Sequence, residues 1–275
     1  MSGNGPGAGR WIGCDLGTHT AAYDERDVIL YALAVGAAPT DLDLVFEKRL
    51  RVLPTFALTR AQWAPDALGS LGAFDVRTTM HASQRLRVLR PLPPAGEVTM
   101  SARVTHVWDK GSAAIFEVEV ESEFSVATWS LFAPGLGGFG GERGPSASGR
   151  RQGPPGHESR LATRPDQPAL YRLLGDRHAM HIDPEAAKAA GMPRPFMHGL
   201  CTLATVTLPL AEAAGAHPAD LVELEGRFAS PVFPGDLLDV RGWQQAGRGE
   251  DVLFEAAVNG TPVLTAGRAQ FRVST

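Results

Sequence analysis

The segments RVLRPLPPAG (87–96) and RFASPVFPG (227–235) repeat one pattern in the two halves of the chain. Their prolines Pro91 and Pro231 stand 140 positions apart (231 − 91). An apolar, helix-like segment precedes each copy, and hairpin patterns follow it. Self-similarity at a fixed spacing is typical of two copies of one structural unit. We therefore expect an α+β fold in which each half of the chain wraps an antiparallel sheet around one long, buried helix.

Alternating apolar and polar residues predict the strands of both halves. In the first half the alternation runs over 98–108, stops at the turn signal DKGS (109–112) and resumes over 114–124, which is the pattern of an antiparallel pair. In the second half, strands are expected at 225–230, 236–243, 251–258 and 261–273. The pair Asn259-Gly260 separates the last two strands and is a strong hairpin signal.

Three apolar segments are predicted to be helix-like, at 24–36, 53–71 and 200–214, and Pro54 and Pro65 interrupt the second of them. The first has acidic residues at its start and a glycine at its end, as helices often do. The last is apolar almost all round, so we expect it to be buried on most of its faces. Pro209 lies inside it and is expected to bend or shorten it.

Residues 133–160 contain Gly, Pro and Ser throughout and show almost no periodicity. This composition predicts a linker, which divides the chain into a first repeat at 11–142, a linker at 143–160 and a second repeat at 161–275. The segment GLGGFGG (135–141) has the glycines of a phosphate-binding loop. It lacks the Lys-Ser/Thr ending of that loop, and a Pro-rich stretch follows instead of a helix, so nucleotide binding is not expected there.

The 44% apolar and 20% charged residues are typical of a soluble globular protein. A net charge of −4 gives no indication of a nucleic-acid or membrane-surface partner. No apolar run approaches the ~20 residues of a membrane span, and the first ten residues lack the apolar core of a signal peptide. Cys14 and Cys201 form no metal or redox spacing, which fits inert thiols in a reducing compartment. We therefore expect a cytoplasmic protein.

The densest group of titratable residues lies in YRLLGDRHAMHIDPEAAKAAGMPRPFMHGLCT (171–202). Its acidic and imidazole side chains are those of Asp176, His178, His181, Asp183 and His198. Groups packed this densely beside a predicted helix start are where acid–base chemistry is first expected.

These motifs resemble a known family. YRLLGDRHAMHIDP followed by HGLCT resembles the hydratase 2 motif of the MaoC-like dehydratase family, which are (R)-specific 2-enoyl-CoA hydratases of hot-dog fold. ILYALAVGA, LPTFA, RPLPPAG, the DKGS turn and SLFAPGLGGFGGER look like the N-terminal repeat of members with two hot-dog units. The resemblance covers 12–271 apart from a divergent stretch at 144–160. It implies a tandem (double) hot-dog and a homodimer.

The resemblance also implies roles for individual residues. Asp176 and His181 correspond to the pair that holds and activates one water molecule, and Gly199 corresponds to the glycine whose N–H binds the thioester oxygen. Further polar positions around the family's site correspond to Tyr171, Asp183, His198, Tyr31, Glu47 and His81, and family activity depends on the position of Glu47. The first repeat typically accommodates the acyl chain. No cofactor is implied, because CoA or phosphopantetheine is part of the substrate.

The chain departs from the family pattern at two positions. The pattern runs Asp, any residue, Asn, Pro, an apolar residue and His, but His178 and Ala179 stand at the Asn and Pro positions. Imidazole can replace an amide as a hydrogen-bond donor, although it is bulkier and titrates. The departure therefore bears on the rate, the pH profile and the preferred substrate more than on the fold.

The chemistry of hydration fits the residue types present. His181 is suited to deprotonating water near neutral pH, and Asp176 can hold the same water and deliver the second proton. Both groups on one water predict a syn addition. Gly199 is predicted at the N-terminus of the buried helix, where a free N–H and the helix dipole stabilise an oxyanion.

Structural alternatives exist for several of these residues. Asp183 before Pro184 is the pattern of a helix N-cap, which we favour over a direct role in catalysis. His198 could be a buried histidine with satisfied hydrogen bonds, Asp176 a turn residue, and Tyr31 and His81 packing residues. A metal site is not expected, because there is neither an HExxH spacing nor a group of thiolates.

The sequence therefore predicts an enzyme that hydrates trans-2-enoyl-CoA to (3R)-3-hydroxyacyl-CoA or catalyses the reverse dehydration. One alternative is a dehydratase of carrier-protein-bound 3-hydroxyacyl groups in polyketide or lipid synthesis. Another is a hot-dog protein that binds acyl thioesters without catalysis, since a fold does not by itself determine a function.

Overall fold

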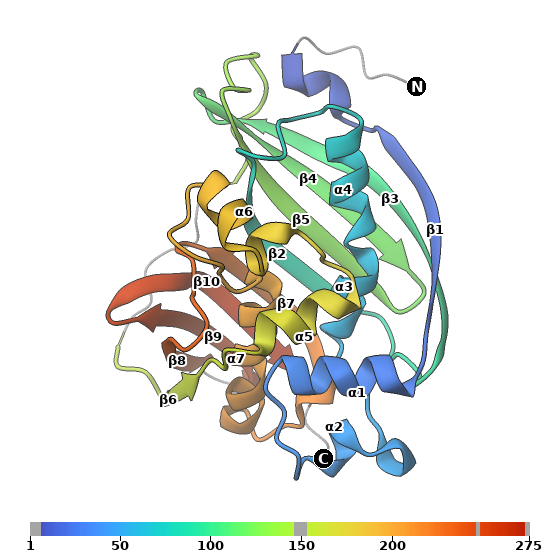
Figure 1. The fold of residues 1–275 in the computed structure, drawn as a ribbon, viewed down its shortest axis with the longest axis vertical. Helices are drawn as coiled ribbons and strands as arrows, with labels where there is room; N and C mark the ends of the chain where they lie inside the picture. Colours follow the sequence, from blue (N-terminus) through green and yellow to red (C-terminus); the bar gives the residue numbers. More distant parts are fainter. Residues whose placement is uncertain (1–6, 146–152, 246–247, 273–275) are drawn as a thin grey trace.

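A single antiparallel sheet forms the framework of the molecule (Figure 1). The structure is a computed structural model that describes residues 7–145, 153–245 and 248–272. The sheet has ten strands in the order β1-β3-β4-β5-β2-β7-β10-β9-β8-β6. Their bounds in that order are Asp15–Tyr23, Gly96–Asp109, Ala113–Ser122, Ser125–Pro134, Met80–Val88, Leu221–Phe228, Thr261–Phe271, Arg248–Val258, Leu237–Gln245 and His157–Ala162.

The centre of the sheet confirms the sequence repeat. Strands β2 and β7 pair with each other, so five strands of the first half lie on one side and five of the second half on the other. Arg87 faces Glu223, and Ser83 faces Arg227. Moving 140 positions along the chain takes Arg87 to Arg227 (87 + 140), and moving 140 positions back takes Glu223 to Ser83 (223 − 140). The two pairs are therefore equivalent positions of the two repeats. The two units are therefore related by an approximate two-fold axis between β2 and β7, and the predicted tandem hot-dog is confirmed.

Helices lie against one face of this curved sheet (Figure 1). Their bounds are α1 Glu25–Ala34, α2 Leu42–Val45, α3 Phe56–Ala61, α4 Trp63–Ser70, α5 Gln167–Tyr171, α6 Pro184–Ala189 and α7 Gly199–Ala213. Short 3-10 helices are η1 Gly7–Trp11, η2 Glu47–Arg49, η3 Arg172–Leu174, η4 Ala179–His181 and η5 Pro218–Asp220. Among the described residues, no helix is long and apolar enough to cross a membrane.

The central helix is continuous in the second repeat only. Helix α7 is buried along most of its length and continues through Pro209 to Ala213, so the expected shortening is not seen. In the first repeat the expected single helix is divided into α3 and α4 at Gln62. Pro65 explains the break, because it has no N–H to donate to the carbonyl of Ala61, four residues earlier.

Two predicted loops behave differently. The turn at Asn259-Gly260 forms as expected, with φ of 49° and 79°, and joins β9 to β10. The linker prediction at 143–160 falls partly on 146–152, outside the described residues. Beyond that gap, β6 begins at His157 and pairs with β8, so 157–160 belong to a strand. That strand lies at the sheet edge and buries none of its residues fully, which explains why no alternating pattern indicated it.

The glycine-rich loop at 135–141 serves the fold. The carboxylate of Asp109, at the end of β3, accepts hydrogen bonds from the backbone N–H groups of Gly111, Gly138 and Gly140, each at 2.8 Å. These hydrogen bonds, led by that of Gly138, lower the pKa of Asp109 to about 2. N–H groups that could hold a phosphate are thus already bound to a carboxylate of the same chain.

Candidate active site

Asp176 is presented by a tight turn between η3 and η4. The backbone N–H of His178 and its ring Nδ1–H both donate to Asp176 Oδ1, at 3.1 and 2.6 Å. No described residue donates to the second carboxylate oxygen, Oδ2, which is therefore available to a water molecule. Burial acts to raise the pKa of Asp176, but the hydrogen bond from His178 and the nearby histidines lower it well below its ordinary value. Asp176 is thus a carboxylate at neutral pH.

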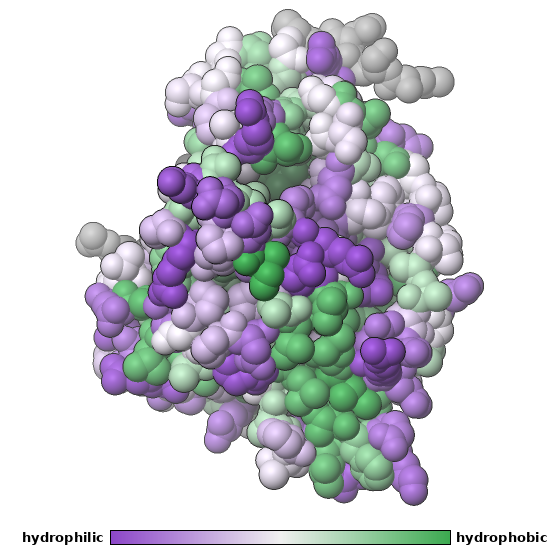
Figure 2. Space-filling model, viewed as in Figure 1, coloured by the Kyte–Doolittle hydropathy of each residue, from purple (hydrophilic) through white to green (hydrophobic). Residues whose placement is uncertain are grey.

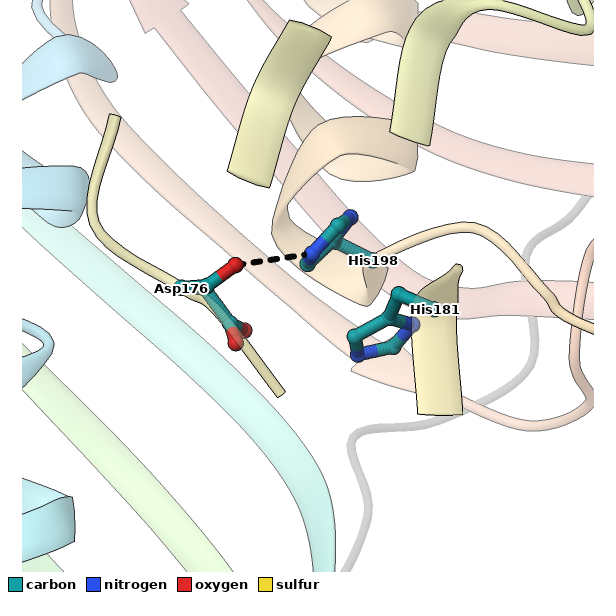
Figure 3. Close-up of side chains that lie close together, drawn as sticks. All are labelled: Asp176, His181 and His198. Atoms are coloured by element: carbon teal, nitrogen blue, oxygen red, sulfur yellow. Dashed lines mark hydrogen bonds between the residues drawn. The ribbon is translucent and has the colours of Figure 1, made fainter. Parts of the chain in front are cut away.

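His181 and His198 complete a cluster with Asp176 (Figure 3). One polar side-chain atom of each residue lies within 4.8 Å of the others. His181 Nδ1–H donates to the carbonyl of Phe196 at 2.9 Å, which leaves Nε2 as the proton acceptor. Burial lowers the pKa of His181, so its imidazole is neutral near pH 7. It is a base in the correct protonation state to accept a proton from water.

His198 has a different role from His181. Its Nε2–H donates to the backbone carbonyl of Asp176 at 3.2 Å, so it positions the turn that presents the carboxylate (Figure 3). Burial lowers the pKa of His198 to about 3. The residue is the N-cap of α7 and is 1% exposed. It is therefore a neutral, buried support of the site.

The same cluster could in principle hold a metal ion, since two imidazoles and a carboxylate lie close together. However, His198 already uses Nε2 toward the carbonyl of Asp176, and its Nδ1 points away from Asp176 in Figure 3. His181 likewise uses Nδ1 toward Phe196. Only His181 Nε2 and the carboxylate remain directed at the same space, which favours acid–base chemistry over a metal site.

A row of aromatic rings extends from the cluster into the first repeat. Tyr171 lies between Tyr31 and His198, with ring centroids 6.0 and 4.8 Å away respectively. Both tyrosines are 1% exposed, and burial raises their pKa values. The predicted placement of Tyr31 and Tyr171 beside the site therefore agrees with the geometry. They act there as neutral phenols.

His81 and Gly199 both lie against Phe228, a residue that the sequence did not indicate. The rings of His81 and Phe228 are 4.7 Å apart, and a Cβ on Gly199 would lie 3.0 Å from the Phe228 ring. Burial lowers the pKa of His81 to about 4, and its Nε2–H donates to the carbonyl of Ser83. Gly199 is the first residue of α7, where N–H groups have no carbonyl partner within the helix.

The first repeat also holds the turn that carries Asp176. Arg60 on α3 donates to the carbonyl of Leu174. Gly175, with φ of 153°, packs so closely that a Cβ there would lie 2.5 Å from the carbonyl oxygen of Thr59. Only glycine fits this position without moving the backbone. The turn that carries Asp176 in one repeat is thus docked on the central helix of the other.

Two predicted residues lie outside the cluster. Asp183 is the N-cap of α6, and its carboxylate accepts from the N–H of Glu185 at 3.0 Å, so the structural interpretation is confirmed. Glu47 lies in η2 on the surface, and the structure gives it no contact with the described residues of the cluster. Its role in activity stays a prediction from the resemblance.

The surface is hollowed near the cluster. Figure 2 shows a hollow with hydrophobic surface inside it between α4 and α6. Helix α6 begins three residues after His181, so this opening lies near the candidate base. A separate groove of about 700 Å³, between the loop after α1, strand β6 and helix α7, includes none of the three clustered residues.

Comparisons with known proteins match both halves of the chain to known domains. Residues 147–261 match the family described as the MaoC like domain, and residues 22–132 match the MFE-2 hydratase 2 N-terminal domain. The enoyl-CoA hydratase ChsH3 of Mycobacterium tuberculosis is 36% identical over 86% of this chain and 89% of its own length. This chain belongs to the MaoC-like dehydratase family.

Other members of the family extend the likeness. Peroxisomal multifunctional enzyme type 2 of Mus musculus is 34% identical over 91% of this chain, which spans 36% of that longer protein. Among solved structures, a MaoC-like dehydratase from Phytophthora capsici superposes with a TM-score of 0.84 at 27% identity, covering 95% of this chain and 96% of that chain. The solved structure thus covers both hot-dog units of this chain, as the two family matches do in sequence.

Proposed function

We propose that this protein hydrates trans-2-enoyl-CoA to (3R)-3-hydroxyacyl-CoA and catalyses the reverse dehydration. The observation that carries the proposal is the approach of the Asp176 carboxylate and the neutral His181 imidazole beside the first turn of α7. The names of the relatives, enoyl-CoA hydratase and 3-hydroxyacyl-thioester dehydratase, describe one reaction in its two directions.

The geometry supports a mechanism with one water molecule. Asp176 Oδ2 and His181 Nε2 hold the water. His181 accepts one proton of the water as the oxygen adds to the β-carbon, and the resulting His181 imidazolium gives that proton to the α-carbon on the same face, while the second proton of the water stays on the new hydroxyl group. Charge that develops on the thioester oxygen is stabilised by the N–H of Gly199 and the positive end of α7. The reaction consumes no cofactor, because CoA or phosphopantetheine is part of the substrate.

Turnover of a trans-2-enoyl-CoA and the configuration of the product test the proposal. We expect loss of the conjugated thioester absorbance and formation of the 3R alcohol, with Asp176→Asn as the inactive, folded control. An inactive wild-type protein that still binds the acyl-CoA would instead identify a thioester-binding protein. A product of 3S configuration would exclude the proposed placement of the water.

The same assay distinguishes the two sources of thioester. The name 3-hydroxyacyl-thioester dehydratase of a relative at 36% identity leaves the carrier open, so we compare one acyl chain on CoA and on a phosphopantetheine carrier protein. We expect the higher kcat/KM with CoA. A cytoplasmic location and a homodimer are further parts of the proposal, and imaging of the tagged chain and sedimentation test them.

A further inference from the structure

His178 lies between two carboxylates that come from different repeats. Its Nδ1 is 2.6 Å from Asp176 Oδ1, and its Nε2 is 3.8 Å from Asp66 Oδ1 on α4. The first contact is a hydrogen bond, and the second is an ion pair. The family pattern has a neutral asparagine at this position, which could not form an ion pair.

Asp66 is held in place to meet His178. Gln62, one turn earlier at the break between α3 and α4, donates to the same Oδ1 atom of Asp66 at 3.2 Å. The side chains of Asp66 and His178 are 48% and 47% exposed, whereas that of Asp176 is only 16% exposed. The outer ion pair is therefore partly hydrated and of modest strength. On its inner side His178 binds Asp176, the candidate catalytic carboxylate.

We propose that Asp66 is a positioning residue for hydration, acting through His178 to hold the carboxylate of Asp176 in place from the opposite repeat. The inference rests on the proposed function. Nothing in the family pattern requires this ion pair, because an amide at the position of His178 can donate to Asp176 but carries no charge.

The charges around His178 give the arrangement a pH dependence. The groups that face it are Asp176 on its own turn, Asp66 on α4, His181 in η4 and His198 at the start of α7. The hydrogen bond to Asp176 raises the pKa of His178 to about 9, and the negative charge of Asp66 adds to this increase. Removing that charge must therefore lower the pKa of His178, so that the imidazolium is lost at a lower pH.

The kinetic test is a double-mutant cycle of Asp66→Asn and His178→Asn at pH 7 and pH 9. We expect Asp66→Asn to lower kcat about two- to fivefold at pH 9, the range for a partly exposed ion pair, and to have little effect at pH 7. In the His178→Asn background the same change should have almost no effect at either pH. Asp75→Asn is the matched control, since Asp75 is 44% exposed and pairs with Arg77.

Three results would overturn the proposal: an equal loss at both pH values, an equal loss in both backgrounds, or the same loss in Asp75→Asn. Thermal unfolding of each variant identifies a protein that has failed to fold. NMR titration of the His178 ring, in the wild-type protein and in Asp66→Asn, then provides the decisive measurement, because it does not depend on turnover.

We expect His178 to titrate well above the ordinary ~6.5 of histidine and several tenths of a pH unit lower in Asp66→Asn. Titration at or below the ordinary value refutes the inference even if the enzyme hydrates enoyl-CoA. Conversely, an inactive wild-type protein with an elevated His178 pKa would refute the proposed function and leave the ion-pair network intact.

Discussion

Replacement of Gly175 by alanine should reduce catalysis as well as stability. Gly175 has φ of 153°, a conformation that side chains with a Cβ rarely adopt, which costs about 1–3 kcal/mol. The new Cβ would also lie 2.5 Å from the carbonyl oxygen of Thr59, where ordinary contact begins at 3.4 Å. Relieving the clash requires a movement of about 0.9 Å (3.4 − 2.5) between the turn and α3.

That movement also displaces the carboxylate of Asp176, because Asp176 is the next residue in the chain. A displacement of about 1 Å at a reacting group can lower the rate about 10²-fold. We therefore expect kcat of Gly175→Ala to fall by about one to two orders of magnitude and the unfolding free energy to fall by about 1–3 kcal/mol. Steady-state hydration kinetics and urea unfolding of the same preparation measure the two quantities.

Gly191→Ala is the matched control. Gly191 follows α6 with φ of 79°, and a Cβ there would meet no atom within 4 Å. It has the conformational cost of an alanine at positive φ without a clash near the site. We expect its kcat to stay within about twofold of wild type, since strain away from the reacting groups does not change their geometry. Equal kcat values for the two variants would refute the docking of the catalytic turn on α3.

The remaining predictions concern the cluster and the fold. Asp176→Asn and His181→Ala should each lower hydration at least about 10²-fold without unfolding, as removal of an acid–base group does; near-wild-type turnover in either would exclude the assigned roles. Asp109→Asn should lower Tm and leave kcat unchanged, because the carboxylate binds loop N–H groups away from the cluster; an unchanged Tm would contradict this. The pKa of His198 is depressed to about 3, so the unfolded chain binds more protons and stability should fall as pH drops below about 6.5. Urea midpoints at pH 7 and 5 should show a smaller fall in His198→Phe, and an identical fall would refute the buried neutral imidazole.

The fold could be predicted because its signals are local or repeated. Alternation over 98–108 and 114–124 and the Asn259-Gly260 turn depend on neighbouring residues only, and all three are found as expected. The 140-residue spacing of Arg87 and Arg227 also holds in the sheet, where β2 and β7 pair so that the two arginines occupy equivalent positions. What failed was the continuous helix of the first repeat, where Pro65 outweighs a favourable apolar composition.

From the residues alone, the candidate site was predictable only within its own stretch of sequence; Tyr31 and His81 of the first repeat came from the family resemblance. Asp176 and His181 lie five positions apart, and the motif that includes them could be recognised. Asp66, Arg60 and Phe228 could not, because each reaches the site through packing between elements far apart in the chain. No spacing or composition rule indicates that α4 of one repeat faces the catalytic turn of the other.

The two-fold arrangement explains why such residues come from the first repeat. At the end of α1, the carbonyl of Ala34 accepts from Cys201 on α7, and Gly36, also at positive φ, packs against Thr205 of that helix. This is the symmetry counterpart of Gly175 docked on α3.

Each repeat therefore positions the other's turn on its own central helix. The turn after Gly36 reads AAP, which has no acid or base, whereas the turn after Gly175 reads DRH. The docking is therefore present in both repeats, whereas among the described residues the Asp–His cluster is present in the second only. Changes in α3 and α4, remote in sequence from the hydratase motif, should therefore alter its rate.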